Sequence, residues 1–561
     1  MKQFKYLTTI LLFTFVFFSC DEDEWLEEDV YDFYSTENSY TTYDQFNAAV
    51  TYLYYQADKY TVRAGATGMY IFHYTTDIAY DANGVYHALN SYEDAVVPDN
   101  VYIKYFWTRW YQMIYNANVI LDRIDGEDTE FDSEEDRTQL KAEAHFFRGF
   151  AYRMLAIQFG GVPLVLEEIT SVKRDFVRST LDETLAQIVS DLTYAAENLP
   201  SVTELSEERL PDAAAYHLLT EIYIMQEDYE SAIAAASKVI DSGDYALMTD
   251  RFGARVDEDG DVFWDLFREG NQNRSSYGNT EAIWVAQSNY GTDAELWTYM
   301  SGYLTPRYWS WTGESDGEDL FLGPTDIYAG RGIGWMVPTD YMLYDIWEDD
   351  TTDMRCSEYN IMYDIKVTNP ESEYYGQYMV ASGAIDTDMS VGATNQYGKY
   401  WTAINTKVTT VGNYPDEYYD DLETGVVNNS SMVSYQDLYQ FRLAETYLLR
   451  AEAYWRNDDS QSAADDINVV RARAGAKLIE ASDVDEDYIL DERARELNFE
   501  EYRSLTLARM GLIDDRLPIY NPMYNGTFSN NGVSDYHNLY PIPQTEIENN
   551  TEAVLEQNPG Y

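Results

Sequence analysis

Two stretches of the sequence combine flat aromatic side chains with amides and carboxylates, a mixture that could bind a sugar. A sugar ring has an apolar C–H face that stacks on aromatic rings and a hydroxyl edge that hydrogen-bonds to polar groups. The stretches are residues 77–100 and residues 297–311. The candidate ligand-binding residues are Tyr80, Asp81, Asn83, Tyr86 and His87 in the first, and Trp297, Tyr303, Trp309 and Trp311 in the second.

These side chains differ in what they could contribute. Trp309 and Trp311 stand two residues apart and would share one face of an extended chain, where they could form a stacking platform. His87 is a lone histidine, which is more often a hydrogen-bonded structural residue than a ligand contact. With 12 Trp and 53 Tyr in the chain, most aromatic residues must pack in the core, so the pattern selects regions rather than single contacts.

The charge of the chain excludes one large class of partners. It has 99 acidic and 37 basic side chains, for a formal net charge of −62. A phosphate backbone would be repelled, so we predict no nucleic-acid binding. A basic membrane-binding face is disfavoured for the same reason.

Metal and catalytic chemistry find little support in the sequence. Two Cys and five His give no thiolate zinc site, and no HExxH string is present. Carboxylates could hold a structural calcium ion, although no EF-hand spacing occurs. Paired carboxylates could in principle hydrolyse glycosidic bonds, but no motif supports that reaction. We therefore predict no cofactor apart from such a calcium ion, and glycoside hydrolysis stays open as an alternative because acidic residues occur throughout the chain.

The N-terminal residues predict an export signal. Lys2 and Lys5 precede an apolar run, residues 7–18, that is too short to span a bilayer. Ser19 before Cys20 resembles a bacterial lipobox, which predicts cleavage before Cys20 and lipid attachment to it, although Phe17 replaces the usual Leu. The acidic run of residues 21–24 then predicts a solvated tether resembling an export signal to the outer face of the outer membrane.

Helical periodicity dominates both ends of the mature chain. Apolar stripes at three- and four-residue spacing predict helices over residues 102–124, 140–159 and 181–200. Residues 216–239 also align with residues 447–470, and each copy predicts two helices around a four-residue break. Small Ala residues let such helices pack closely as a hairpin, the unit of a tetratricopeptide-like array.

Residues 249–434 have a different residue pattern, in which Gly, Asn, Asp and Ser separate short aromatic runs. This pattern predicts loops with a few short strands and helices. The fold class is thus mainly α: helical hairpins form a scaffold that carries a long irregular insertion. The predicted organisation is a signal peptide (1–19), an acidic lipid-anchored tether (20–40), an N-terminal helical region (41–248), a loop-rich aromatic insertion (249–434) and a C-terminal helical region (435–561).

Several strings resemble the SusD/RagB family of outer-membrane nutrient-binding lipoproteins, in the family's order and over nearly the whole chain. In the N-terminal part they are an early helix with Trp110, Ile114, Tyr115 and Asn118, and residues 159–164, where the next predicted helix ends. In the C-terminal part they are the hairpin segments 448–454 and 468–475, the helical segment 489–500, and the terminal segments 539–543, 546–547 and 557–561.

The resemblance implies a non-catalytic protein that captures an oligosaccharide or polysaccharide and delivers it to a SusC-like TonB-dependent transporter, anchored by Cys20 in the outer membrane and facing outward. It places the ligand site partly on the loop before the Trp110 helix. It also implies that Glu492, Arg493, Arg495 and Glu496 form structural ion pairs. Peptide or protein binding stays open as an alternative, because helical-hairpin arrays present grooves to polypeptides.

Overall fold

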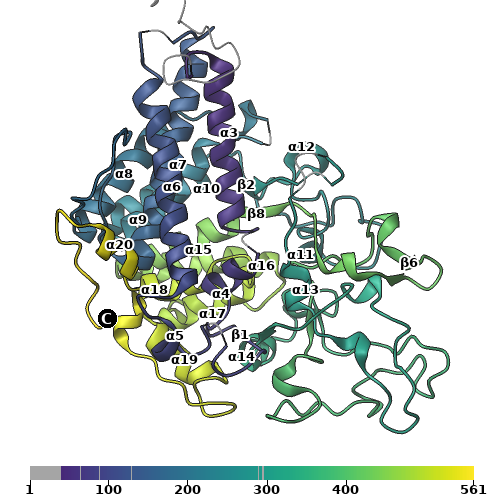
Figure 1. Cartoon of the computed structure of the whole chain (residues 1–561). Helices are drawn as coiled ribbons and strands as arrows, with labels where there is room; N and C mark the ends of the chain where they lie inside the picture. The colour runs from purple at the N-terminus through teal and green to yellow at the C-terminus, as the bar shows by residue number, and fades with distance from the viewer. Residues whose placement is uncertain are drawn as a thin grey trace, which may run out of the picture.

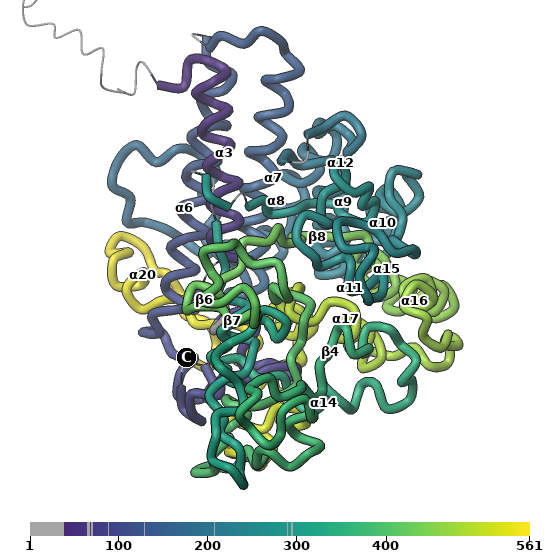
Figure 2. The backbone as a smooth tube through the Cα atoms, turned by 90° about the vertical axis from the view of Figure 1, so that its right-hand side faces the viewer, coloured from purple at the N-terminus to yellow at the C-terminus, as the bar shows by residue number. Residues whose placement is uncertain are grey.

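The computed structural model of the chain describes residues 39–561 apart from residues 64, 88, 128, 207, 289 and 293–295. Long helices run side by side in one part of the molecule, and a loop-rich part flanks their lower half (Figure 1). The tube view, turned by 90°, shows the same division (Figure 2). The predicted signal and residues 20–38 of the predicted tether, including Cys20, lie outside the described residues. Within the described part, no helix is long and apolar enough to cross a membrane.

The mainly helical fold class is confirmed, and helices dominate both ends of the described chain. In the N-terminal part they are α3 (Tyr43–Tyr60), α4 (Gly65–Phe72), α5 (Tyr92–Ala95), α6 (Val101–Arg123), α7 (Glu134–Phe159), α8 (Leu181–Asn198), α9 (Asp212–Met225) and α10 (Tyr229–Ile240). In the C-terminal part they are α15 (Leu443–Arg456), α16 (Ser460–Arg473), α17 (Glu486–Leu497), α18 (Arg503–Met510), α19 (Ile513–Tyr520) and α20 (Gln544–Asn549).

The ends of the long helices follow local sequence signals. The Asn100 side chain accepts hydrogen bonds from the first backbone N–H groups of α6, and Ser133 does the same for α7. A reciprocal capping box between Thr180 and Glu183 begins α8. Gly160, at φ 74°, ends α7 in a conformation that favours glycine. The three predicted helices are confirmed, with ends shifted by a few residues.

The two sequence copies form matching helical hairpins, as predicted. Glu227 (φ 60°) and Asp458 (φ 61°) adopt the left-handed conformation at the same place in the two turns. The next residue, Asp228 or Asp459, then caps the second helix of its hairpin. Between the hairpins α10 packs against α15, where Ala232 lies in one buried cluster with Leu449 and Ala453. Small side chains thus allow the close stacking of a tetratricopeptide-like array.

The region between the hairpins is built from short elements. Its helices are α11 (Val262–Asp265), α12 (Arg274–Tyr277), α13 (Met300–Leu304) and α14 (Asp340–Leu343). The strands of the described chain are β1 (Ala79–Asp81), β2 (Ala282–Ala286), β3 (Met336–Pro338), β4 (Ile361–Met362), β5 (Ile404–Asn405), β6 (Tyr419–Asp421), β7 (Val426–Val427) and β8 (Leu438–Arg442). They form four antiparallel pairs, β1–β3, β2–β8, β4–β5 and β6–β7.

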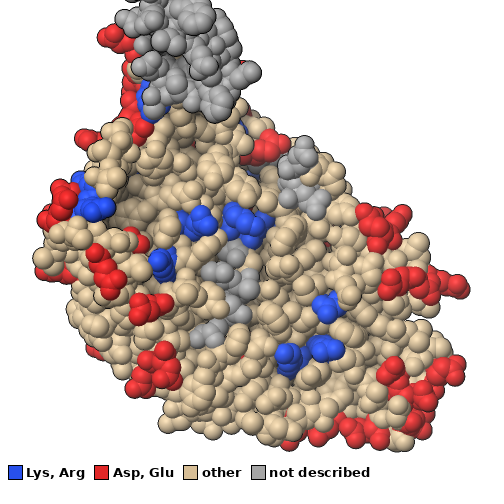
Figure 3. All heavy atoms as spheres, in the orientation of Figure 1, with Lys and Arg blue, Asp and Glu red and all other residues tan. Residues whose placement is uncertain are grey.

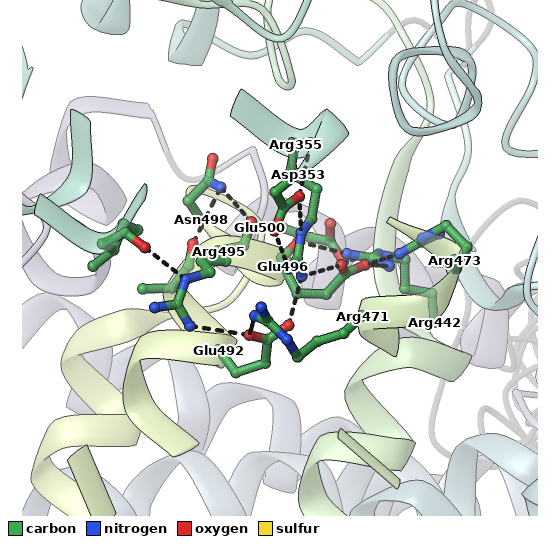
Figure 4. Close-up of polar contacts among 12 residues, drawn as sticks. Asp353, Arg355, Arg442, Arg471, Arg473, Glu492, Arg495, Glu496, Asn498 and Glu500 are labelled. Carbon is green, nitrogen blue, oxygen red and sulfur yellow. Dashed lines mark hydrogen bonds and ion pairs between the residues drawn. The ribbon is translucent and has the colours of Figure 1, made fainter. Parts of the chain in front are cut away.

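A buried cluster of ion pairs joins the short elements to the helical scaffold (Figure 4). Arg355, from the loop-rich region, contacts Glu492 at 2.8 Å and Glu496 at 3.0 Å on α17. Arg442, at the end of β8, contacts Glu496 at 2.5 Å. We call this the central ion-pair cluster; its members are Glu281, Asp353, Arg355, Arg442, Arg471, Arg473, Glu492, Arg495, Glu496 and Glu500.

The structural role expected for the charged residues of α17 is confirmed. Glu492 and Glu496 are fully buried, and each contacts more than one arginine. Arg493 contacts Glu445 and Glu501, while Arg495 contacts Glu492. Buried ions are stable only when partners compensate the lost hydration, so removing one member leaves its partners with uncompensated charge.

This cluster makes stability depend on acidic pH. Burial alone would raise the pKa of Glu492, but Arg355, Arg495 and Arg471 outweigh it and lower the pKa to about 2. A carboxylate with a lowered folded-state pKa contributes stability above its unfolded pKa, and this contribution disappears as pH falls toward the folded pKa. For Glu492 the window extends from roughly pH 4.5 down to about pH 2.

We predict that Glu492→Gln lowers the free energy of unfolding near pH 7 by about 3–5 kcal/mol, because a buried charge loses its partner. The difference from the wild type should shrink as pH falls from about 4.5 toward 2. Urea denaturation at several pH values measures both effects. Exposed Glu197 on α8 offers a matched control, Glu197→Gln, with little effect. A difference that does not change with pH would contradict the assignment.

Candidate ligand-binding site

The pairing of β1 with β3 holds the first predicted stretch against the segment that begins at Trp335. Tyr80 of β1 lies opposite Val337 of β3, and just beyond the pair the Ala82 N–H donates to the carbonyl oxygen of Trp335 at 2.9 Å. Two residues before β1, Asp77 forms ion pairs with Arg503 at 2.7 Å and Arg516 at 3.0 Å. The loop that follows β1 is therefore fixed at its start by both main-chain pairing and charge.

Asp81 organises this loop. It is fully buried, and its carboxylate accepts hydrogen bonds from the backbone and side-chain nitrogens of Asn83 at 2.9 and 2.7 Å. It also contacts His87 Nδ1 at 2.5 Å, and this hydrogen bond raises the pKa of His87. Asp81 is thus a positioning residue, and Asn83 and His87 are the polar groups held by it.

The predicted residues of the first stretch divide by exposure. The Tyr86 side chain is 69% exposed, and the His87 side chain is 43% exposed. Asn83 is partly exposed. Tyr80 is only 2% exposed, and its hydroxyl donates to the carbonyl oxygen of Tyr397 at 3.2 Å. Tyr80 and Asp81 therefore support the loop from beneath, and the other three can meet a ligand.

The second stretch does not form the predicted stacking platform. Residues 308–310 adopt a 3₁₀-helix, so Trp309 and Trp311 do not lie on an extended chain, and that prediction is wrong. Trp311 is 5% exposed in a buried hydrophobic cluster, and its Nε1 donates to the carbonyl oxygen of Tyr400. Trp309 is half-buried, and its Nε1 donates to the carbonyl oxygen of Gly332 at 2.9 Å.

The remaining aromatic residues of this stretch form a ladder of rings. Trp297 is 38% exposed and packs edge-on against Tyr299. Tyr303 is buried and stacks between Tyr299 and Trp335, with ring centroids 5.4 and 5.0 Å apart. Trp335 is half-buried at the far end of this ladder. Trp297 and Trp335 thus retain accessible ring surface, whereas Tyr303 supports them.

Lys399 connects the two stretches. Its Nζ donates to the side-chain oxygen of Asn83 at 2.9 Å, and its carbonyl oxygen accepts from the backbone N–H of Arg307 at 3.0 Å. The Arg307 guanidinium lies 4.9 Å from the ring of Trp309 and 5.9 Å from that of Tyr400. Arg331 approaches the same ring, with its guanidinium 5.8 Å from Trp309. Asn83, His87, Arg307, Trp309, Arg331 and Lys399 therefore belong to one surface, which we call the candidate site.

Sequence reasoning missed Trp335, Lys399, Tyr400 and Arg331. One signal for them was present: Gly330, Gly332 and Gly334 alternate just before Trp335. A Cβ atom at Gly332 or Gly334 would meet the backbone oxygens of Pro306 or Lys399, so the chain passes directly against both segments there. Alternating glycines of this kind indicate a close backbone approach.

The site supplies aromatic faces, amide groups and cations, which suits binding through stacking and hydrogen bonds. In the part of the chain that the structure describes, no group of three or more His, Cys, Asp or Glu side chains is arranged to hold a metal ion. Structural calcium therefore stays a prediction without an assigned position.

Comparison with known proteins agrees with this architecture. The model described as "SusD family" matches residues 280–561, half of the chain, and the model described as "Starch-binding associating with outer membrane" matches residues 24–224. The chain belongs to the SusD family. The family resemblance in the sequence is thereby confirmed.

Individual relatives of this SusD-family protein extend the comparison. It is 27% identical to SusD-like protein P25 of Formosa agariphila over 99% of both chains. It is 38% identical to the starch-binding protein SusD of Bacteroides thetaiotaomicron over 22% of each chain. A solved laminarin-binding SusD-like protein is similar in fold, with a TM-score of 0.66 at 20% identity, covering 93% of this chain and 100% of that one.

The two tryptophans of the second stretch should respond differently to truncation. We predict that Trp311→Ala lowers the free energy of unfolding by about 3–5 kcal/mol, because removing the ring leaves a cavity in a buried hydrophobic cluster. Trp309→Ala should cost clearly less, because its ring is half-buried. Chemical denaturation of the two variants side by side measures this order. Equal losses would contradict the difference in packing.

Proposed function

We propose that this SusD-family protein binds an oligosaccharide or polysaccharide nutrient at the candidate site and delivers it to a SusC-like TonB-dependent transporter. The observation that carries the proposal is the convergence of the two loops: exposed Tyr86 and His87 lie on a loop whose Asn83 is joined to the Arg307–Trp309 segment through Lys399. Relatives named as starch-binding and laminarin-binding support a glycan as ligand.

The groups that these loops expose support ligand binding rather than catalysis. Asp81 is the carboxylate at the centre of the first loop, and its hydrogen bonds to Asn83 and His87 occupy it structurally. The accessible groups are rings, amides and cations held in place by β1–β3 pairing and by the ion pairs of Asp77. A preorganised surface of this kind loses little conformational entropy when a ligand binds.

A glycan panel tests the binding function directly. Isothermal titration calorimetry of residues 21–561 against plant and algal polysaccharides should find at least one ligand. Tyr86→Ala should weaken that binding roughly fivefold, the equivalent of about 1 kcal/mol from lost stacking, with an unchanged thermal midpoint. Tyr277→Ala, which removes a 40% exposed ring from α12, is the matched control. Binding of oligopeptides but of no glycan would favour the peptide-binding alternative.

Attachment and location belong to the same proposal. We predict that Cys20 carries lipid and holds the protein at the outer face of the outer membrane. In cells, Cys20→Ala should abolish labelling by a fatty-acid analogue and release the protein from the membrane fraction. The other cysteine provides the control, because half-buried Cys356 lies in the folded part and Cys356→Ala should leave labelling intact. Unchanged labelling of Cys20→Ala would refute the anchor. Co-purification with a transporter of the SusC type tests the partner.

A further inference from the structure

Three cations of the candidate site have no acidic partner. None of Arg307, Arg331 and Lys399 forms an ion pair with a carboxylate among the residues that the structure describes. The Nε atoms of Arg307 and Arg331 are buried without a hydrogen-bond partner in the same part of the chain. At their charged ends, Arg331 Nη1 donates to Met432 Sδ at 3.2 Å, and Lys399 Nζ donates to the Asn83 amide oxygen at 2.9 Å.

Arg307 lies close enough to repel each of the other two cations. The guanidinium groups of Arg307 and Arg331 lie 4.9 and 5.8 Å from the same Trp309 ring. Burial, followed by repulsion from Arg307, lowers the pKa of Arg331. Burial lowers the pKa of Lys399 too, and Arg307 adds to this effect while Asp81 opposes it. Without a ligand, Arg307 therefore lies near two like charges.

A shortage of acids does not explain the missing partners, because the chain has 99 acidic and 37 basic side chains. Figure 3 shows Lys and Arg side chains in the interior of one face, some of them over the region of α13, and Asp and Glu side chains mostly toward its edges. Asp81, the carboxylate whose charge acts on Lys399, is fully buried and bound by Asn83 and His87. The cations thus keep their charge available to a ligand.

We propose that the ligand of the candidate site is an anionic glycan, whose carboxylate or sulfate groups pair with Arg307, Arg331 and Lys399 while the neighbouring aromatic rings contact its apolar faces. This inference rests on the proposed function and names its substrate class. The planar guanidinium forms two parallel hydrogen bonds with such anions, and these charge-assisted bonds are stronger than neutral ones. Distant acids on the surface oppose binding little, since at physiological salt charges beyond about 8 Å are screened.

Matched glycan pairs test the charge requirement. Calorimetry would compare polygalacturonate with its fully methyl-esterified form, alginate with carboxyl-reduced alginate, and carrageenan with desulfated carrageenan. We expect at least one anionic member to bind, with an affinity that falls as salt rises and that exceeds the affinity for its neutral counterpart by about tenfold or more. The carboxylated and sulfated arms distinguish the two sources of charge.

Charge-removing variants connect the effect to the three residues. Arg307→Gln, Arg331→Gln and Lys399→Met should each weaken binding of the anionic glycan about tenfold. Arg331→Gln should also keep or raise the thermal midpoint of the ligand-free protein, because it relieves repulsion, whereas a structural role would lower it. Exposed Arg174 and Lys238 lie elsewhere, and Arg174→Gln and Lys238→Met remove the same charges as controls.

The possible results separate this inference from the proposed function. Salt-insensitive binding of neutral glycans, unchanged in Arg307→Gln and Lys399→Met, would overturn the anionic ligand and leave glycan binding standing. Anionic binding that falls equally in the control variants would overturn the site. Binding of oligopeptides with no response to any glycan of either kind would overturn both proposals.

Discussion

The central ion-pair cluster is the constraint on which the loop-rich region of this protein depends. That region has short strands and helices of four or five residues, so main-chain hydrogen bonding alone gives it little rigidity. Arg355 and Arg442 instead fasten it to Glu496 on α17, in a region from which water is excluded. Because a buried charge is costly without its partner, small displacements of the loop-rich region relative to α17 are unfavourable. Loops held in this way can present side chains at fixed positions.

The sequence predicted the scaffold well because its signals are local. Apolar periodicity, the caps at Asn100 and Ser133, and the repeated turn at Glu227 and Asp458 each depend on neighbours within a few residues. The candidate site depends on pairings between distant segments, such as Ala82 with Trp335 and Asn83 with Lys399. No periodic pattern encodes these pairings, so the sequence could select the right loops without their partners. For Trp311 the aromatic residue type was recognised, but its burial follows from packing against Tyr400 and its neighbours.

Charge is distributed in two different ways in this molecule. In the central cluster, cations and carboxylates alternate, and the arginines are matched by acids such as Glu281 and Glu496. In the candidate site Arg307 and Lys399 lie beside aromatic rings and amides instead. The same residue type therefore stabilises the fold in one place, and in the other it lacks the ion pairs that would stabilise it. Binding sites commonly carry such local costs, because groups arranged for a ligand are not optimal for the protein alone.

The connection of β1 to β3 also has a consequence for how the protein matures. Ala79 pairs with Pro338, and Asp77 just before the strand is bound by Arg503 and Arg516, so the first loop is completed by residues from the middle and the end of the chain. Contacts between such distant segments form late, since the intervening chain must first be ordered. During synthesis the N-terminal helices can assemble early, but the first loop can be completed only after nearly the whole polypeptide has emerged. A chain interrupted before α18 could keep much of its scaffold and still lack the contacts that complete this loop.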